Sequence, residues 1–559
     1  MPSKFRPDAS NKLDELRENL KFLWIEIVGL IQTTKALLDQ PGSLFYKKMA
    51  SRDDYIDNLK TIVENACFFR IHGGDAVERE EINLLRSIHT ISINLERIAD
   101  FCVNIARQVE YLSDPIFVQR FEYKTLLEVI ESETMKILPA LDERDLSAAL
   151  EVCRSEYRLD QLYGEAFRSI LQELQLGGPA SDLVTSLFIF RYLERIGDSL
   201  LNIGEALLFR IMGEKIKIHQ FEALQQTLSH SGYTSDFSNI EMKSIWGTRS
   251  GCRISLIESR EGASEKSQGI FKEGNHDKIL REKDNLIRWQ SIFPGLTPRV
   301  FGYHETSETA SLLIEFLPGC TFEEVLLSAE TDIVQNALFL LRQVIEEIWN
   351  HTCCKQPVPA RFMHQLLARI DDSNRLHPSL VRPDKQLGKL PIPSTIRLIR
   401  ECADIEKDIA SPISVFCHGD FNLNNIVYDH EAQRIYYIDV YRSHEGDYIE
   451  DAAVLLVSIF RLPTFEPILR ERLNVMIAEF LDLLLQFSKL QGDTTFQVRL
   501  ALGLCRNFHT SIRFEQNTGF AKEMVLRSHY LMERIVSHPD RSNWSSFSFP
   551  EDILFLETM

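Results

Sequence analysis

The feature that most constrains the fold of this chain is a helical stretch that occurs twice. The twelve residues LERIADFCVNIA, from Leu95, and LERIGDSLLNIG, from Leu193, are identical at seven positions and lie 98 residues apart. Similarity at a fixed offset indicates two copies of one structural unit. Apolar residues such as Leu16 and Leu20 recur at helical spacing throughout residues 10–228. We therefore expect an all-α region built from two related bundles.

Each copy carries acidic and amide side chains at a spacing of four, which places them on one helix face. Two carboxylates one turn apart are good oxygen ligands for a divalent or ferric ion. The alternative is a solvated helix face with local Glu–Arg pairs. Recurrence in both copies favours the metal interpretation, and acids of the preceding helices, Asp57 and Asp160, could complete the ligand sets. The repeated trios are Glu96, Asp100 and Asn104, and Glu194, Asp198 and Asn202.

The sequence pattern changes after the helical region. The polar, serine-rich stretch 229–239 is typical of a linker. Short apolar runs cut by glycine and charge then predict antiparallel strands within 240–320. Helical periodicity returns over 321–540 and is interrupted once, at 413–440. A small β-rich lobe followed by a larger helical lobe is the layout of a kinase.

The interruption contains the motif VFCHGDFNLNNIVYDH, from Val415 to His430, followed by RIYYIDV. Phosphoryl transfer needs a carboxylate beside the acceptor hydroxyl and metal ions that bridge the triphosphate. Asp420 is the candidate base. Asn425, five residues later, matches the kinase spacing from base to metal-binding asparagine, and Asp439 stands where the second magnesium ligand belongs. His418 would then be structural and hold the loop.

Candidate nucleotide-binding residues precede this motif. Gly247 and Gly251 lie where a phosphate-covering hairpin is expected, although IWGTRSGCRISLIES is no GxGxxG sequence. Lys272 lies on the next strand, as the phosphate-pairing lysine of a kinase does. Glu282 is predicted to open the following helix and to pair with Lys272. The segment from Glu315 to Leu317 is predicted to be a hinge whose backbone faces adenine. An edge-strand lysine and a solvated helix acid are the alternatives for the proposed ion pair.

Charge and composition disfavour several classes of protein. The formal net charge of -19 disfavours nucleic acid as a partner, because phosphates need basic side chains. The ten cysteines form no CxxC pair, which favours buried thiols in a reducing, cytoplasmic protein. No stretch is long and apolar enough for a membrane span, and the N-terminus has no apolar core of a secretory signal.

Over residues 10–225 the chain resembles the PhoU family. Its members are tandem three-helix bundles that carry an ExxxD motif in each repeat, bind metal clusters there and are associated with the regulation of phosphate uptake. The resemblance implies that Glu96, Asp100, Glu194 and Asp198 are metal ligands for iron, zinc or manganese. It also implies a phosphate transporter or sensor as a partner. The third position of each trio is asparagine rather than a carboxylate.

Residues 240–540 resemble the aminoglycoside phosphotransferase and choline kinase family, a branch of the kinase fold. LTPRVFGYHE and GDYIEDAA support this resemblance together with the motif above. It implies that Asp420 is the catalytic base, that Asn425 and Asp439 hold Mg²⁺, and that Lys272 pairs with the ATP phosphates. Asp451 is expected to be a structural anchor.

The sequence thus predicts a multidomain chain, with a tandem three-helix bundle followed by a bilobal α+β kinase-like domain. The favoured function is ATP-dependent phosphotransfer to the hydroxyl of a small molecule, with the bundle as a metal-binding regulatory domain. One alternative is a phosphate-responsive adaptor whose kinase-like lobe binds nucleotide without turnover. Another, phosphotransfer to a protein, is disfavoured because the segment between YYIDV and GDYIEDAA is too short for an activation loop.

Overall fold

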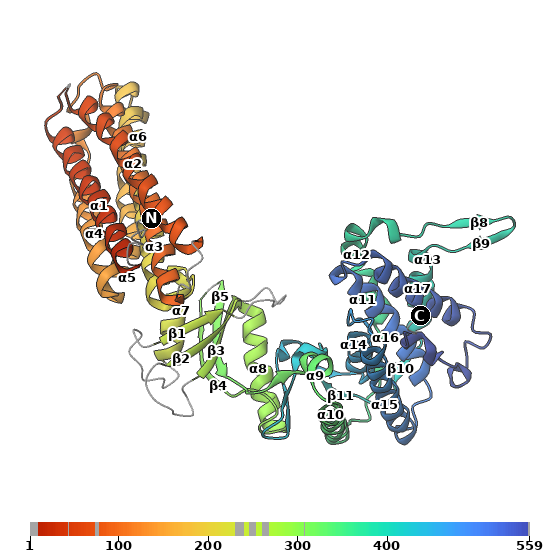
Figure 1. Ribbon diagram of the computed structural model, residues 1–559. Helices are drawn as coiled ribbons and strands as arrows, with labels where there is room; N and C mark the ends of the chain where they lie inside the picture. Colours follow the sequence, from red (N-terminus) through yellow and green to blue (C-terminus); the bar gives the residue numbers. More distant parts are fainter. Residues whose placement is uncertain are drawn as a thin grey trace, which may run out of the picture. The chain divides into compact units, whose positions relative to one another are not determined.

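The computed structural model describes residues 9–42, 44–72, 78–229, 240–244, 253–259, 268–306 and 308–556. Contacts divide the chain into two compact units, Met1–Gly274 and Asn275–Met559. The predicted fold class is confirmed, because a helical region is followed by a mixed α+β region with antiparallel sheets (Figure 1).

The first unit contains two sets of three long helices that run alongside one another (Figure 1). Within each set every helix packs against the other two, and the sets meet through α3 against α6 and α1 against α4. A shorter helix, α7 (Ile218–Ser229), packs on α5. The six long helices are α1 (Ala9–Asp39), α2 (Leu44–His72), α3 (Arg79–Val109), α4 (Lys124–Glu143), α5 (Leu146–Gln175) and α6 (Ala180–Met212).

The repeated stretch lies in α3 and α6, the helices through which the two sets pack together. Its apolar positions are fully buried in both copies, which explains why they recur. In α6 a Cβ atom on Gly204 would lie 2.4 Å from Sγ of Cys153, so only glycine allows α5 and α6 to approach this closely. The buried positions are Leu95, Ile98, Cys102 and Ile105, and Leu193, Ile196, Leu200 and Ile203.

Three strands follow in the same unit: β1 (Ile240–Ser244), β2 (Arg253–Ser259) and β3 (Gln268–Asn275). They pair antiparallel, with Met242 opposite Ile257 and Ile257 opposite Gly269. The prediction of an antiparallel hairpin before Lys272 is therefore confirmed. Gly247 and Gly251 lie outside the described residues.

The second unit begins with α8 (His276–Ile292), then β4 (Val300–Glu305) and β5 (Thr309–Glu315), which pair antiparallel. The prediction that Glu282 opens this helix is wrong. The helix begins at His276, because the side chain of Asn275 accepts a hydrogen bond of 3.3 Å from the Lys278 amide and caps it. β3 therefore leads into α8 without a loop.

The rest of the second unit is mostly helical. The prediction that helical structure is interrupted only once is wrong. Besides the motif, β7 (Val358–Pro359) pairs with β10 (Ala410–Ser411), and β8 (Lys385–Leu387) forms a hairpin with β9 (Leu390–Ile392). Gly388, with φ of 60°, makes the tight turn of that hairpin. The helices are α9 (Phe322–Ser328), α10 (Thr331–Thr352), α11 (Phe362–Leu367), α12 (Ile370–Leu376), α13 (Thr395–Glu406), α14 (Ile449–Phe460), α15 (Pro467–Gln491), α16 (Phe496–Ser511) and α17 (Thr518–Val536).

The motif itself forms short strands and turns. β11 (Val415–Cys417) pairs with β14 (His444–Gly446), and β12 (Ile426–Asp429) forms a hairpin with β13 (Arg434–Tyr437). On its other edge β12 pairs with β6 (Cys320–Thr321). No helix among the described residues is long and apolar enough to cross a membrane.

Candidate functional site

The loop after β11 is held by a buried carboxylate. Asp451, at the start of α14, accepts hydrogen bonds from the backbone amides of His418 (2.6 Å) and Gly419 (2.8 Å). Burial raises the pKa of Asp451, and these two bonds together with His418 oppose that shift. Gly419 has φ of 82°, and a Cβ atom there would lie 2.3 Å from the Arg442 carbonyl oxygen. The expectation that Asp451 is a structural anchor is confirmed.

His418 contributes to the same scaffold. Its Nε2 lies 3.0 Å from the Ile438 carbonyl oxygen, and its Nδ1 lies 3.3 Å from the amide of Asp420. The ring is buried and packs on Tyr437, with centroids 5.6 Å apart. This confirms a structural role, in which His418 ties β13 to the loop that carries Asp420.

Asp420 presents a partly exposed carboxylate, with 27% of its side chain accessible. One oxygen accepts a hydrogen bond of 3.2 Å from Nδ2 of Asn422, and the other lies 3.1 Å from a guanidinium nitrogen of Arg442. Sequence reasoning did not select Arg442. Its signal is its place three residues after Asp439, in the turn η5 (Val440–Arg442).

The β12–β13 hairpin brings Asn425 and Asp439 to the same end of two neighbouring strands. Asn425 immediately precedes β12, and the amide of Ile438, after β13, donates a hydrogen bond of 3.0 Å to the Asn425 carbonyl oxygen. Nδ2 of Asn425 donates 2.9 Å to the Asp420 carbonyl oxygen. Asp439 adopts the left-handed conformation, with φ of 60° and ψ of 46°, which aspartate tolerates better than most residues. Three predicted site residues therefore lie on one connected turn system.

Helix α8 supports the turn that follows Asp439. Nδ2 of Asn285 donates hydrogen bonds to the carbonyl oxygens of Val440 (2.9 Å) and Ser443 (3.2 Å). Nε1 of Trp289 donates a hydrogen bond of 2.9 Å to Oγ of Ser443. The Ser443 hydroxyl in turn donates a hydrogen bond of 3.1 Å to the His418 carbonyl oxygen. These hydrogen bonds connect α8 both to the turn after Asp439 and to the loop that carries Asp420.

The predicted nucleotide-binding residues lie as follows. Lys272 is on β3 in the first unit and is 5% exposed, whereas Glu282 is on α8 in the second and is 1% exposed. Their pairing stays a prediction. Glu315 ends β5, and its carboxylate forms an ion pair of 2.7 Å with Arg299. Leu317 follows β5 and is half-buried.

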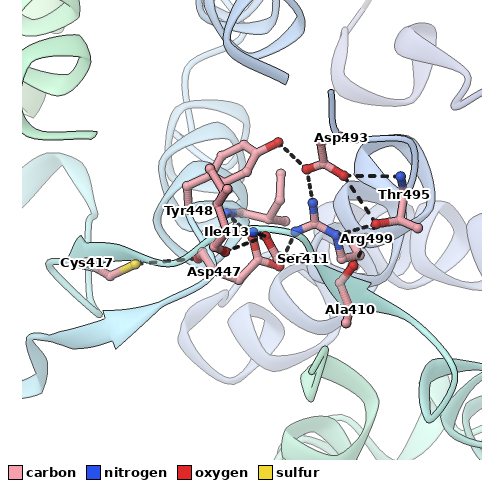
Figure 2. Close-up of polar contacts among 10 residues, drawn as sticks. Ala410, Ser411, Ile413, Cys417, Asp447, Tyr448, Asp493, Thr495 and Arg499 are labelled. Carbon is pink, nitrogen blue, oxygen red and sulfur yellow. Dashed lines mark hydrogen bonds and ion pairs between the residues drawn. The ribbon is translucent and has the colours of Figure 1, made fainter. Parts of the chain in front are cut away.

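A buried ionic network lies next to β11 and β14, and sequence reasoning missed it (Figure 2). Arg499 of α16 has no exposed side-chain surface and forms ion pairs with Asp447 and Asp493. Tyr448 donates a hydrogen bond of 2.7 Å to Asp493, and Nε of Arg499 donates 3.1 Å to Oγ of Thr495. The carbonyl oxygen of Asp447 accepts a hydrogen bond of 3.5 Å from the Cys417 thiol (Figure 2). Arg499 therefore ties α16 to the strand that leads into the motif.

In the helical unit, each repeated acid pair faces a second acid pair on the preceding helix. Burial, followed by the charges of Asp100 and Asp57, raises the pKa of Glu96 to about 7. Burial, then Asp100 and Asp57, raises the pKa of Asp53 to about 6. The first carboxylate cluster is Asp53, Asp57, Glu96 and Asp100.

The second carboxylate cluster is the counterpart in the second repeat. Burial and the neighbouring acids raise the pKa values of Glu156, Asp160 and Glu194. Glu194 and Asp198 also pair with Arg191 (2.5 Å) and Arg195 (3.0 Å). The second carboxylate cluster is Glu156, Asp160, Glu194 and Asp198. Asp53 and Glu156 were missed, although each stands four residues before Asp57 or Asp160.

In each cluster, two predicted ligands on one helix thus lie near two acids on the preceding helix. Within the described residues, however, no group of three or more His, Cys, Asp or Glu side chains is arranged closely enough to hold a metal ion as it stands. One oxygen each of Glu156 and Glu194 is buried without a hydrogen-bond partner. Nine cysteines of the described part of the chain are free thiols.

Comparison with known proteins agrees with this division. The PhoU domain family matches residues 29–109 and 124–207, and the phosphotransferase enzyme family matches residues 274–476. The chain therefore carries a PhoU domain followed by a domain of the phosphotransferase enzyme family.

Individual relatives cover one part of the chain each. A phosphate-specific transport system accessory protein PhoU homolog of Clostridium acetobutylicum is 28% identical over 209 residues, which is 37% of this chain and 95% of the relative. One from Zymomonas mobilis is 29% identical over 191 residues, 34% of this chain and 80% of the relative.

Solved structures also match each part of the chain. The crystal structure of PhoU from Pseudomonas aeruginosa has 22% identity and a TM-score of 0.33 over 37% of this chain and 100% of its own. That of aminoglycoside-3'-phosphotransferase of type VIII has 16% identity and a TM-score of 0.34 over 52% of this chain and 99% of its own.

Proposed function

We propose that this protein is an ATP-dependent phosphotransferase that acts on the hydroxyl group of a small molecule, and that its PhoU domain binds metal and regulates it. The observation that carries the proposal is the connected turn system of Asp420, Asn425 and Asp439. A partly exposed carboxylate and two oxygen-bearing side chains lie there on a scaffold held by Asp451 and His418. The phosphotransferase family match includes all of these residues.

In the proposed reaction the acceptor oxygen attacks the γ-phosphorus of ATP. The bond from that phosphorus to the β–γ bridging oxygen breaks, and ADP leaves with the bonding electrons. The hydroxyl proton passes to a carboxylate oxygen of Asp420, which acts as general base. Arg442, 3.1 Å from that carboxylate, orients it.

The side chains of Asn425 and Asp439 suit Mg²⁺, which prefers amide and carboxylate oxygens. Nδ2 of Asn425 donates a hydrogen bond to the Asp420 carbonyl oxygen, so Oδ1 of Asn425 would be the atom that binds Mg²⁺. When bound, Mg²⁺ would neutralise charge on the phosphates of ATP. Lys272, Glu282 and the backbone from Glu315 to Leu317 remain our candidates for holding the rest of ATP.

Replacing Asp439 with alanine is expected to weaken Mg²⁺-dependent ATP binding, because a carboxylate ligand is lost. Calorimetric titration of the full chain with ATP, with and without Mg²⁺, measures this effect. We expect the affinity to fall roughly 10-fold or more with Mg²⁺ and to change little without it. An unchanged affinity for magnesium-ATP would contradict the assignment of Asp439 as a Mg²⁺ ligand.

The two carboxylate clusters fit a metal ion chemically, although their present spacing would have to tighten. Acids one turn apart on facing helices repel each other when ionised, and the unpartnered oxygens of Glu156 and Glu194 lack any compensating donor. A bound cation would remove both penalties. We propose iron, zinc or manganese as the ligand, with Glu96, Asp100, Glu194 and Asp198 as central ligands.

Addition of the right metal is expected to raise the melting temperature of the PhoU domain within the full chain. At a metal concentration of 100 times Kd the gain is about 2.7 kcal/mol per site, or roughly 5–10 °C. The double variant Asp100→Asn, Asp198→Asn should abolish the rise. If scanning calorimetry shows the same melting temperature with and without iron, zinc and manganese, the clusters are ordinary acids on helix faces.

A screen of small hydroxyl compounds for acceptor-dependent ATP consumption tests the main proposal. Formation of a phosphorylated acceptor by the full chain supports it. Binding of ATP without turnover of any acceptor would instead favour a phosphate-responsive adaptor. Because the relatives of the PhoU domain are named as accessory proteins of phosphate-specific transport, we propose a phosphate transporter or sensor as the partner in either case. Copurification with such a transporter would test that.

A further inference from the structure

Helix α2 carries apolar side chains on two of its faces. The inner face holds residues such as Ile56 and Val63, which are fully buried against the neighbouring helices. A second line of side chains, spaced alternately by four and three residues, is exposed along its whole length. This spacing keeps side chains on one side of a helix and suits packing against another helix. We call the line the α2 ridge: Ser51, Tyr55, Asn58, Ile62, Asn65, Phe69 and His72.

The ridge presents large apolar groups and no ionised ones. Tyr55, Ile62 and Phe69 are 51%, 49% and 69% exposed. None of the ridge residues is Asp, Glu, Lys or Arg, in a chain whose formal net charge is -19. The outward face of a surface helix normally carries charged and polar side chains. The α2 ridge therefore has the composition of a contact surface.

The second repeat shows that the bundle itself does not require an apolar ridge. The acid pair Asp53 and Asp57 of α2 corresponds to Glu156 and Asp160 of α5, which lie 103 residues further along the chain. At the same offset, Phe68 beside the ridge keeps an apolar counterpart, whereas the three large ridge residues do not. The counterparts of Tyr55, Ile62 and Phe69 are Arg158, Glu165 and Gln172, and all three are exposed.

Helix α1 extends this surface on one side. A short connection joins α1 to α2 and the two helices pack together, so they run antiparallel. Glu26 of α1 pairs with Arg52 of α2 across 3.2 Å. Phe22 stands one turn from Glu26, on the side of α1 that faces α2, and Ile25 follows it. Both are exposed, at 56% and 46%, and border the ridge near Tyr55.

The size of this surface matches what a dimer needs. Its five large apolar side chains are 46% to 69% exposed, which leaves roughly 100 Å² of each, or about 500 Å² in all, in contact with water. A standard interface buries about 800 Å² on each partner, and about 65% of a homodimer interface is apolar. The two apolar areas are therefore similar.

The ridge is nearly symmetric about Ile62. An aromatic residue lies seven positions before it and another seven positions after it, and an asparagine lies four before it and three after it. If two copies of α2 crossed antiparallel at Ile62, Tyr55 of one copy would lie level with Phe69 of the other, and Asn58 level with Asn65. Aromatic rings would then meet aromatic rings, and amides would meet amides.

We propose that this protein forms a two-fold dimer in which the α2 ridges of two copies pack antiparallel, with Phe22 and Ile25 at the rim. A surface that complements itself fits an isologous contact, in which both copies use the same patch. Two chains of net charge -19 repel each other, so the copies can meet only through a surface without like charges. A basic partner would be selected by acidic side chains, which the ridge lacks.

Sedimentation velocity of the full chain over roughly 0.1–100 µM measures the association. We expect a species of twice the chain mass at the upper concentrations. Ile62→Glu introduces the residue that the second repeat carries at this position and places two carboxylates at the axis. It should raise the dissociation constant of the dimer roughly 100-fold or more. Because position 62 is exposed, the melting curve of the monomer should stay unchanged. Phe69→Gln is a second variant, with an effect in the same direction.

Tyr157→Arg is the matched control, because Tyr157 of α5 is 52% exposed and lies outside the ridge. It should leave the dissociation constant unchanged. Ile62→Cys locates the axis, since a residue at a two-fold axis meets its own counterpart and mild oxidation should join the copies by a disulfide. The parent protein, which keeps the exposed Cys320 and Cys354, is the control for that reaction.

A dimer that Ile62→Glu dissociates and that Ile62→Cys cross-links supports the proposal. A parent protein that stays monomeric over the whole concentration range would overturn it, and the ridge would then be covered by another molecule or another part of the chain. A dimer that withstands both Ile62→Glu and Phe69→Gln would use a different surface and would overturn it as well. A dimer without the Ile62→Cys cross-link would contradict antiparallel packing at Ile62.

Discussion

Asp420→Asn is expected to abolish phosphotransfer and to leave the affinity for ATP within about twofold. Asparagine cannot accept the hydroxyl proton, and loss of a general base lowers kcat roughly 10²- to 10⁴-fold. The amide keeps an oxygen for the hydrogen bond from Nδ2 of Asn422, so the loop should hold its shape. Steady-state kinetics with an identified acceptor and calorimetric titration with ATP measure the two effects separately.

The matched control for this variant is Asp404→Asn, at an exposed aspartate of α13 that pairs with Lys407 across 2.6 Å. It should leave turnover unchanged. If Asp420→Asn retained turnover within a few-fold of the parent protein, another group would have to take the proton, and the assignment of Asp420 as the base would fail. A parallel loss of ATP binding would point to collapse of the loop instead.

Arg499→Met is expected to destabilise the second unit by about 3–5 kcal/mol, because it leaves two buried carboxylates without their shared cation. Asp447 and Asp493 have 2% and 0% of their side chains exposed, so neither can be solvated in place. The network also holds the Asp447 carbonyl oxygen that bonds Cys417 (Figure 2). Chemical denaturation followed by circular dichroism measures the loss, as a lower midpoint for the unit's transition.

Two further variants test whether the loss of stability comes from the buried charges. Arg397→Met breaks an exposed pair with Glu401 and should cost less than about 1 kcal/mol. The triple variant Arg499→Met, Asp447→Asn, Asp493→Asn removes the buried charges together and should regain a large part of the stability. A single variant as stable as the parent protein would show that water or a rearrangement solvates the two acids.

The sequence determined the features that depend on local spacing. Asp420, Asn425 and Asp439 lie together because all three belong to one loop and the hairpin that follows it, so their order along the chain already fixes their neighbourhood. The duplicated LERI stretch likewise gave the two helical repeats, since identical apolar spacing buries identical helix faces. Both features can be recognised from the spacing of residues within one short segment.

Boundaries were less predictable than elements. The start of α8 depends on whether the side chain of Asn275 caps the helix, which charge and periodicity do not reveal. The β8–β9 hairpin is short and lies within a mainly helical region, where a few residues carry too weak a periodic signal to predict strands.

Only the tertiary structure decided which distant side chains meet. Arg499 follows its partner Asp447 by 52 residues, and Arg442 lies 3.1 Å from Asp420, which precedes it by 22 residues. In the bundle, Asp53 and Glu156 join the repeated acids only because α2 packs on α3 and α5 on α6. A single sequence carries periodicity within a helix but no register between helices, and the charge of a residue gives no indication of its partner. The turn that carries Asp420, Asn425 and Asp439 could therefore be predicted from the chain alone, whereas the ion pairs and hydrogen bonds that hold its surroundings required the fold.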